Sequence, residues 1–185
     1  MSRIDHRRIA ILATDGYEKS ELFEPKRQLA EAGATVTIIA PDTGEIRSWD
    51  ENDWGEAVSV DMTIENANPD DFDALVLPGG QINPDVLRVN KAAVAMIKKF
   101  HDAGKPIAAI CHAPWLLIEA GLIDGREATS YHSIRTDMEN AGANWRDREV
   151  VTDSNLITSR QPGDLDAFCN KLIEMLASGA DARAA

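Results

Sequence analysis

The chain repeats one pattern along most of its length: a short apolar run, then a segment with helical spacing of apolar residues. Strand-length apolar runs lie at residues 8–14, 34–40, 72–77, 106–110, 128–129, 150–152 and 156–159. Helices are expected at residues 20–32, 92–103, 113–120, 133–141 and 165–177. Strands separated by helices are typical of a parallel sheet with helices packed on both faces. The sequence therefore predicts an α/β fold.

One stretch departs from this pattern. Residues 41–69 are irregular and polar, with a candidate strand at 57–60, and we expect a hairpin or excursion at the edge of the sheet. The rest of the 185 residues contains no repeat, linker or domain boundary. We therefore expect a single domain over residues 1–185, with a core at about 8–177 and a frayed tail at 178–185.

Composition and charge exclude several classes of function. The net charge is −12 and no basic residues cluster, which argues against nucleic acid or an anionic membrane as a partner. No apolar run approaches the roughly 20 residues of a transmembrane helix, and the first residues lack the apolar core of a signal peptide. The two cysteines lie far apart and give neither a disulfide framework nor metal-ligand spacing. We expect no metal or cofactor, and a reduced, cytoplasmic setting.

Three polar or glycine-rich loops follow expected strands, at residues 15–18, 78–80 and 111–112. In a parallel sheet the carboxyl ends of the strands meet at one edge, and ligands bind there. The three loops are therefore expected to converge and form one site.

The third of these loops carries the strongest candidate for chemistry. Cys111 stands where an apolar strand stops and a helix begins, a geometry that lifts a thiol out of the sheet edge. Backbone N–H groups and the helix dipole at such a position favour the thiolate. The alternative is a small buried residue that packs as a hydrophobe. The adjacent histidine and the glycine-rich neighbouring loop favour a nucleophile for Cys111, whereas Cys169, in the middle of a helix, is expected to be inert.

Two groups beside Cys111 are candidates to assist it. His112 is a candidate base for the thiol proton, provided that the sharp turn brings its ring round to the sulfur. If the ring does not reach, the backbone N–H of His112 and that of Gly80 are expected to form an oxyanion hole.

The first loop supplies a carboxyl group. If the loops converge, Glu18 meets Cys111 in a confined space, where it is expected to stay protonated and to donate a hydrogen bond to sulfur. The same donor would stabilise an oxidised sulfur. Glu21 and Glu24, further along the helix, are expected at the surface.

These features together resemble the PfpI-like superfamily, which contains intracellular proteases and protein deglycases. The resemblance rests on Cys111-His112, on Pro78-Gly79-Gly80 after a strand, and on Glu18, and it extends from Ile9 to about Leu176. Residues 140–143 and 149–151 are most similar to the PfpI branch. The resemblance implies a flavodoxin-like three-layer α/β/α sandwich with a mainly parallel sheet, related to class I glutamine amidotransferase domains.

The resemblance also implies roles for individual residues. Cys111 becomes the nucleophile, Glu18 its hydrogen-bonding partner, and His112 the histidine that an acidic residue of a neighbouring subunit orients. That acidic position falls on Asp85, where relatives often carry the longer glutamate. Gly79 and Tyr131 are implied around the pocket. His132 stands where many relatives have proline, and it is expected either at the pocket rim or simply at the surface.

Three functions remain open at this point. The first is a cofactor-independent stress-protection enzyme of deglycase or glyoxalase type, in which Cys111 attacks methylglyoxal, glyoxal or their protein adducts. The second is an ATP-independent peptidase that uses Asp85, His112 and Cys111. The third is a redox sensor or chaperone-like protein that responds to oxidation of Cys111. The resemblance implies a homo-oligomer, a dimer or larger, for each of them.

Overall fold

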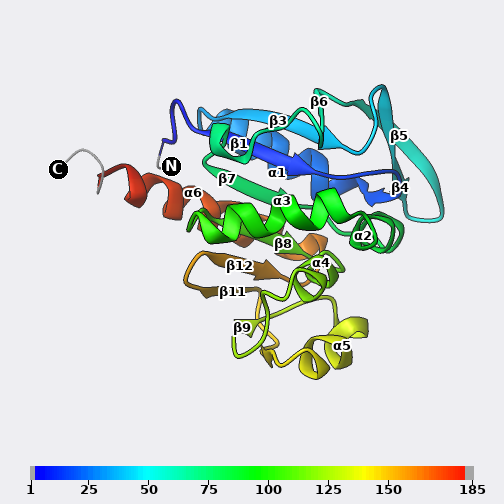
Figure 1. Cartoon of the computed structure of the whole chain (residues 1–185), viewed down its shortest axis with the longest axis vertical. Coiled ribbons are helices and arrows are strands. Elements are labelled where there is room, and N and C mark those ends of the chain that lie inside the picture. The colour runs from blue at the N-terminus through cyan, green and yellow to red at the C-terminus, as the bar shows by residue number, and fades with distance from the viewer. Residues whose placement is uncertain (1–2, 182–185) are drawn as a thin grey trace.

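The computed structural model describes residues 3–181. Its centre is a seven-stranded sheet in the order β11-β12-β8-β7-β1-β3-β6 (Figure 1). All neighbouring strands of this sheet are parallel except β11, which is antiparallel to β12. The strands are β1 (Arg8–Leu12), β3 (Thr35–Ala40), β6 (Met62–Thr63), β7 (Ala74–Leu77), β8 (Ile107–Ile110), β11 (Val150–Asp153) and β12 (Leu156–Ser159).

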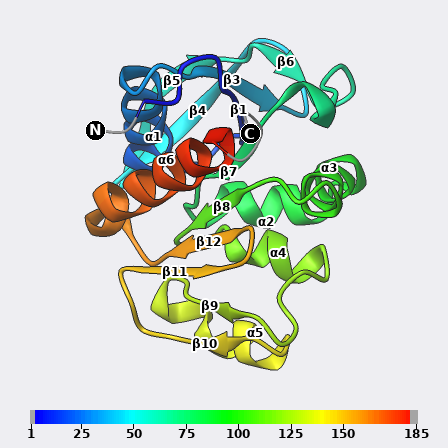
Figure 2. The ribbon, with the colours of Figure 1, turned by 90° about the vertical axis from the view of Figure 1, so that its left-hand side faces the viewer.

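Helices cover both faces of the sheet. Figure 2 shows the sheet edge-on, with α1 (Lys19–Glu31) and α6 (Leu165–Asp181) on one side of it. The opposite side carries α2 (Ile82–Arg88), α3 (Lys91–Asp102) and α4 (Pro114–Glu119). This arrangement confirms the predicted three-layer, flavodoxin-like sandwich with a mainly parallel sheet.

The core consists of two apolar layers, one on each face of the sheet. Side chains alternate across a strand, so Ile9 and Ile11 of β1 join the layer under α1 and α6. Ala10 and Leu12 of the same strand join the layer under α3 and α4. All four are fully buried, which explains why the central strands read as continuous apolar runs in the sequence.

The expected hairpin is present beside the sheet. β4 (Glu45–Asp50) and β5 (Asp53–Ser59) pair antiparallel, and β4 also pairs with the short β2 (Tyr17–Glu18). In this second sheet Glu18 lies opposite Trp49. The hairpin is therefore attached to the loop that follows β1.

The remaining elements are short: β9 (Glu127–Ala128), α5 (Arg135–Asn140), β10 (Asn144–Trp145), and 3₁₀ turns at Pro69–Asp71, His132–Ile134 and Pro162–Asp164. The sequence did not indicate α2, because it is a single short helix with a proline inside it and too few residues for a period. Helix α6 extends to Asp181, so the tail expected to fray from 178 begins as helix, and its residues 182–185 lie outside those described. Among residues 3–181, no helix is long and apolar enough to span a membrane.

Candidate active site

The three loops that the sequence grouped together do meet at one edge of the sheet. The register pairs Ile11 with Val76 and Leu77 with Ala109, so β1, β7 and β8 end side by side. A cavity of about 460 Å³ opens there, lined by residues of all three loops, of the β4–β5 hairpin and of the segment after β12.

Cys111 occupies a strained turn between β8 and α4. Its φ is 63°, in the left-handed region that residues other than glycine seldom adopt. Two backbone hydrogen bonds hold it there: its N–H donates to the carbonyl of Ser159 at 3.1 Å, and its carbonyl accepts from Tyr131 N–H at 2.8 Å. Strain of this kind persists only where the surroundings impose it, and it is concentrated at functional sites. The predicted elbow, a sharp turn between a strand and a helix with Cys111 at its apex, is present in this geometry.

Gly79 lies against the elbow so closely that no side chain fits. A Cβ on Gly79 would stand 2.6 Å from Cys111 Cβ and 2.5 Å from Glu21 Oε2. The next residue, Gly80, has a φ of 77°, and a Cβ there would stand 2.5 Å from the carbonyl oxygen of Gly16. The Pro78-Gly79-Gly80 loop therefore needs both glycines to approach the first loop and Cys111.

The carboxyl group beside Cys111 belongs to Glu21. This side chain is fully buried, and its Oε2 accepts a hydrogen bond of 2.8 Å from Gly79 N–H. Burial and the charge of Glu18 raise the pKa of Glu21 to about 8, so its carboxyl remains largely protonated at neutral pH. The other oxygen, Oε1, has no partner among the described residues. The expectation that Glu21 lies at the surface is therefore wrong.

Glu18, the predicted partner of the sulfur, lies at the rim of the same cavity and is half-buried. Its Oε1 accepts a hydrogen bond of 3.1 Å from Ser20 Oγ, and its backbone N–H donates to Gly79 O at 3.4 Å. Helix α1 begins at Lys19, which turns residue 21 towards the elbow and leaves residue 18 at the helix start. The buried position that the sequence interpretation gave to Glu18 thus belongs to Glu21.

The surroundings of Cys111 do not favour a free thiolate. Burial raises the pKa of its thiol, and the negative charge of Glu21 raises it further, while the backbone N–H groups of Gly80 and His112 lower it. From its place at a helix start, the sequence had predicted that the pKa of the Cys111 thiol would be lowered. The pKa of Glu21 is raised as well, so ionisation of both the thiol and the carboxyl at the same time is unfavourable.

The His112 ring does come round to the sulfur. Its Nδ1 lies 3.1 Å from Cys111 Sγ, and its Nε2 lies 3.1 Å from Ser133 Oγ. Tyr131 stacks on the ring, with 4.8 Å between the centroids. Burial, followed by the nearby charge of His132, lowers the pKa of His112 to about 4, so the ring is neutral at neutral pH. The contact with Ser133 was not predicted, because no sequence pattern distinguishes this serine, in a short turn, from any other.

The remaining predicted residues lie further from the sulfur. Tyr131 lines the cavity, whereas His132 is exposed and packs on the outer side of Tyr131, with 4.4 Å between the ring centroids. Asp85 is exposed on α2, and within one chain Ser133 rather than Asp85 bonds Nε2 of His112.

Asn83 is a further residue that the sequence did not reveal. It is fully buried, and its Oδ1 accepts from Thr14 N–H at 2.8 Å. Its Nδ2 donates to the carbonyls of Pro78 and Gly79 at 2.8 and 3.2 Å. One side chain thus joins the loops after β1 and β7 and fixes the position of Gly79 against Cys111.

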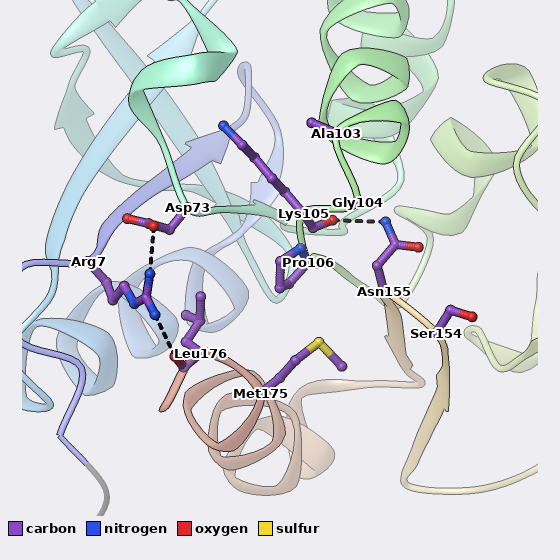
Figure 3. A pocket seen from close by; sticks show the side chains of 10 residues that line it. All are labelled: Arg7, Asp73, Ala103, Gly104, Lys105, Pro106, Ser154, Asn155, Met175 and Leu176. Atoms are coloured by element: carbon purple, nitrogen blue, oxygen red, sulfur yellow. Dashed lines mark hydrogen bonds and ion pairs between the residues drawn. The ribbon is translucent and has the colours of Figure 1, made fainter. Parts of the chain in front are cut away.

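A second cavity, of about 490 Å³, lies at the opposite edge of the sheet (Figure 3). Its charged groups already have partners: Arg7 binds Asp73 at 2.9 Å and the carbonyl of Leu176 at 3.1 Å, and Lys105 donates to the carbonyl of Pro69. It therefore presents few unused polar groups to a ligand. No group of three or more His, Cys, Asp or Glu side chains within residues 3–181 is placed to hold a metal ion.

The sequence profile of the DJ-1/PfpI family matches residues 7–175. The chain belongs to the DJ-1/PfpI family. The resemblance that the motifs indicated is thereby confirmed.

Individual relatives agree with this placement. Deglycase PfpI of Pyrococcus furiosus is 45% identical over 169 residues, which cover 91% of this chain and 99% of the relative. A Bacillus subtilis relative with a provisional cysteine-protease name is 41% identical over 170 residues, covering 92% and 98% of the two chains. Among solved structures, DJ-1beta of Drosophila melanogaster superposes with a TM-score of 0.84 at 31% identity, covering 96% of this chain and 91% of that one.

Proposed function

We propose that this protein is a cysteine-dependent, cofactor-independent hydrolase or lyase that acts on methylglyoxal, glyoxal or their protein adducts. The observation that carries the proposal is the placement of Cys111 Sγ, 3.1 Å from the neutral His112 ring and beside a buried, protonated Glu21. The deglycase names of its relatives support the same reaction class.

The neutral His112 ring acts as the base. With its proton on Nε2, the ring donates to Ser133 Oγ and leaves Nδ1 free to accept the thiol proton. Because burial raises the thiol pKa and lowers that of His112, the proton leaves Cys111 as the sulfur attacks and not in a separate earlier equilibrium.

The reaction needs no external oxidant. Cys111 Sγ adds to the aldehyde carbon of methylglyoxal, or displaces the amine or thiol of an adduct at that carbon. A proton then moves from this carbon to its neighbour through an enediol, so the aldehyde carbon is oxidised as the ketone carbon is reduced. The product is a lactoyl thioester on Cys111, and one water hydrolyses it to lactate and the free thiol.

The backbone is proposed to stabilise the oxyanion that forms during addition. The N–H groups of Gly80 and His112 are directed at the Cys111 side chain and lower its pKa, so they are placed for negative charge at the reacting centre. Glu21, as a neutral acid, supports the sulfur without repelling it.

A homo-oligomer is proposed from the exposed face of α2. Ile82, Val86 and Val89 share one side of this helix, with exposed fractions of 38%, 48% and 79%, and Asp85 stands among them. A second copy packed on this face would cover the apolar residues and bring an acidic side chain to the interface. Val89→Glu is expected to shift the sedimentation coefficient towards the monomer, and an unchanged coefficient would place the interface elsewhere.

The alternative function is an ATP-independent peptidase, which the provisional name of the Bacillus subtilis relative favours. It requires Asp85 of a neighbouring subunit to reach His112 and displace Ser133 from Nε2. We propose a cytoplasmic setting for either activity, since a working thiol needs a reducing compartment and both cysteines are free.

The test is lactate release from methylglyoxal by the purified protein. Wild type and Cys169→Ala are expected to release lactate at similar rates, and Cys111→Ala to release none above the uncatalysed rate. Equal release by Cys111→Ala and wild type would refute the proposal. Hydrolysis of unmodified peptides in the absence of dicarbonyl turnover would favour the peptidase.

A further inference from the structure

The ionisable side chains that line the active-site cavity are unbalanced in charge. Glu18, Glu21 and Glu51 line it together with the neutral ring of His112. Among residues 3–181, no lysine or arginine is part of this lining. Glu21 is the innermost of the three, and its buried Oε1 has no hydrogen-bond partner among the described residues. Because its carboxyl is largely protonated, the charge imbalance comes from Glu18 and Glu51, which lie nearer the mouth. A group that enters the cavity therefore meets carboxyl oxygens and finds no cation.

Three lysines or arginines lie within two residues of a lining residue: Lys19, Arg47 and Arg160. Arg47 is not part of the lining; its Nε donates to the carbonyl of Gly55 at 3.0 Å, and it has no carboxylate partner among residues 3–181. The other two are paired with carboxylates. Lys19, which follows Glu18, has its Nζ 2.9 Å from Asp50 Oδ2. Arg160, near the lining residue Pro162, binds Asp164 at 2.9 Å and Asp147 at 2.8 Å. Neither offers a free positive charge to a bound anion.

An aromatic ring stands beside these carboxylates. Trp49 lines the cavity and lies opposite Glu18 in the β2–β4 pairing. Its Nε1–H donates to the carbonyl of Glu51 at 3.0 Å, and Trp54 packs edge-on against it, with 5.6 Å between the centroids. The hairpin turn thus fixes the indole ring against the backbone of Glu51, whose exposed side chain also lines the mouth. Indole faces attract ammonium and guanidinium groups, and carboxylates do the same.

We propose that this mouth selects dicarbonyl adducts whose carrier bears a separate cationic group, ammonium or guanidinium, over adducts on anionic carriers. Glu51 and Trp49 are the specificity-determining residues, because they lie on the hairpin at the mouth and not at the sulfur. The inference rests on the proposed function, since it concerns the carrier from which Cys111 takes the dicarbonyl. The reacting carbon is the same for every carrier, so the charge of the carrier is the property that the mouth discriminates.

The test uses three methylglyoxal hemithioacetals that share one reacting centre. Their carriers are thiocholine, 2-mercaptoethanol and 3-mercaptopropionate, which bring a quaternary ammonium that cannot cyclise onto the aldehyde carbon, a neutral hydroxyl and a carboxylate. Lactate release is measured at matched concentrations of free methylglyoxal. We expect kcat/KM to fall in that order, by about fivefold for each unit of charge, as for charges a few ångströms apart in a water-filled mouth. The differences should shrink in about 0.5 M salt, which screens them.

Substitutions on the hairpin test whether Glu51 and Trp49 cause the charge selectivity. Glu51→Gln is expected to reduce the ratio of kcat/KM between the thiocholine and mercaptopropionate adducts, and Glu51→Lys to invert it. Trp49→Leu should lower turnover of the thiocholine adduct more than that of the neutral one. Glu45→Gln is the matched control, because it removes one exposed carboxylate at the other end of the same hairpin and should leave the ratio unchanged.

The outcomes separate this inference from the proposed function. Equal kcat/KM for the three adducts, or a ratio that Glu51→Lys does not move, would overturn the charge selection and leave the reaction intact. Failure to release lactate from all three adducts and from free methylglyoxal would overturn the proposed function, and the charge selection with it.

Discussion

Cys111 Sγ and His112 Nδ1 lie 3.1 Å apart, although the two residues are neighbours in the sequence. Side chains of consecutive residues normally point away from each other in a helix or a strand. The left-handed backbone of Cys111, at a φ of 63°, turns the two side chains towards one cavity. The elbow therefore both raises the sulfur out of the sheet and places the His112 ring beside it, where we propose that it acts as the base.

Glu21 should give the protein a distinctive pH dependence of stability. Its pKa is about 8 in the folded chain and near 4.5 when exposed, so above pH 4.5 the unfolded chain holds fewer protons and stability falls as pH rises towards 8. His112, with a folded pKa of about 4, acts in the opposite sense between pH 4 and 6.5. Between pH 6.5 and 8 the Glu21 effect stands alone.

In that window we expect the free energy of unfolding to fall by ~2 kcal/mol in wild type relative to Glu21→Gln. Urea unfolding at several pH values measures the difference. Glu18→Gln is the matched control, since it lies at the cavity rim, and it should keep most of the wild-type slope. Parallel curves for wild type and Glu21→Gln would mean that Glu21 is ionised in the folded protein.

Substitutions at Ser133 and Asp85 test which side chain orients the His112 ring. Ser133→Ala removes the only side chain bonded to Nε2 in the described part of the chain, and should lower kcat/KM for methylglyoxal about three- to tenfold. Asp85→Asn should change it by less than twofold if lactate formation is the reaction. The reverse ranking would show that a partner's carboxylate, and not Ser133, holds the ring.

Gly79→Ala should be among the most damaging small substitutions. The added methyl group would press on Cys111 and Glu21, and it would displace either the elbow or the buried carboxyl. We expect a loss of about 2–4 kcal/mol of stability, measured by urea unfolding, together with most of the activity. Gly163→Ala is the control, because its nearest neighbouring atom would be 3.8 Å away. A stable, active Gly79→Ala protein would contradict the packing described here.

Oxidation should distinguish the two cysteines. Cys111 lines the cavity, whereas Cys169 is 1% exposed within the helical layer of α6. After mild peroxide treatment, mass spectrometry is expected to find sulfenic or sulfinic acid on Cys111 and unmodified Cys169. The Glu21→Gln variant should shift the ratio of these products, since the carboxyl proton can bond an oxidised sulfur. Oxidation of Cys169 at a comparable rate would remove the cavity as the cause of selectivity.

The fold could be predicted because its signals are local and repeated. Each buried central strand needs an apolar run on both faces, and each helix needs one apolar side, so the alternation was visible in the sequence. Helix α2 carries Pro84 and spans only Ile82–Arg88, and it is fixed mainly by Asn83 and by packing on α4. Tertiary contacts of this kind produce no periodic pattern of apolar residues in the sequence.

The strand-to-helix turn at Cys111 and the position of His112 beside it could also be predicted from local sequence, but the buried carboxyl group could not be assigned. Glu18, Glu21 and Glu24 are three residues apart, and a shift of one residue in the start of α1 changes which of them faces inward. One signal was available: Glu21, Pro25 and Leu29 are spaced by four residues and share the buried side of α1. A polar residue on the apolar side of a helix was the evidence for Glu21.

The central claim is that Cys111 forms a covalent bond with the dicarbonyl during turnover. Acid quenching of the enzyme with methylglyoxal, followed by peptide mass spectrometry, tests it most directly. We predict that the Cys111 peptide gains the mass of one methylglyoxal as a lactoyl thioester, that this form disappears as lactate accumulates, and that the Cys169 peptide stays unchanged. Undiminished lactate formation with an unmodified Cys111 throughout, or in a Cys111→Ala protein, would contradict it.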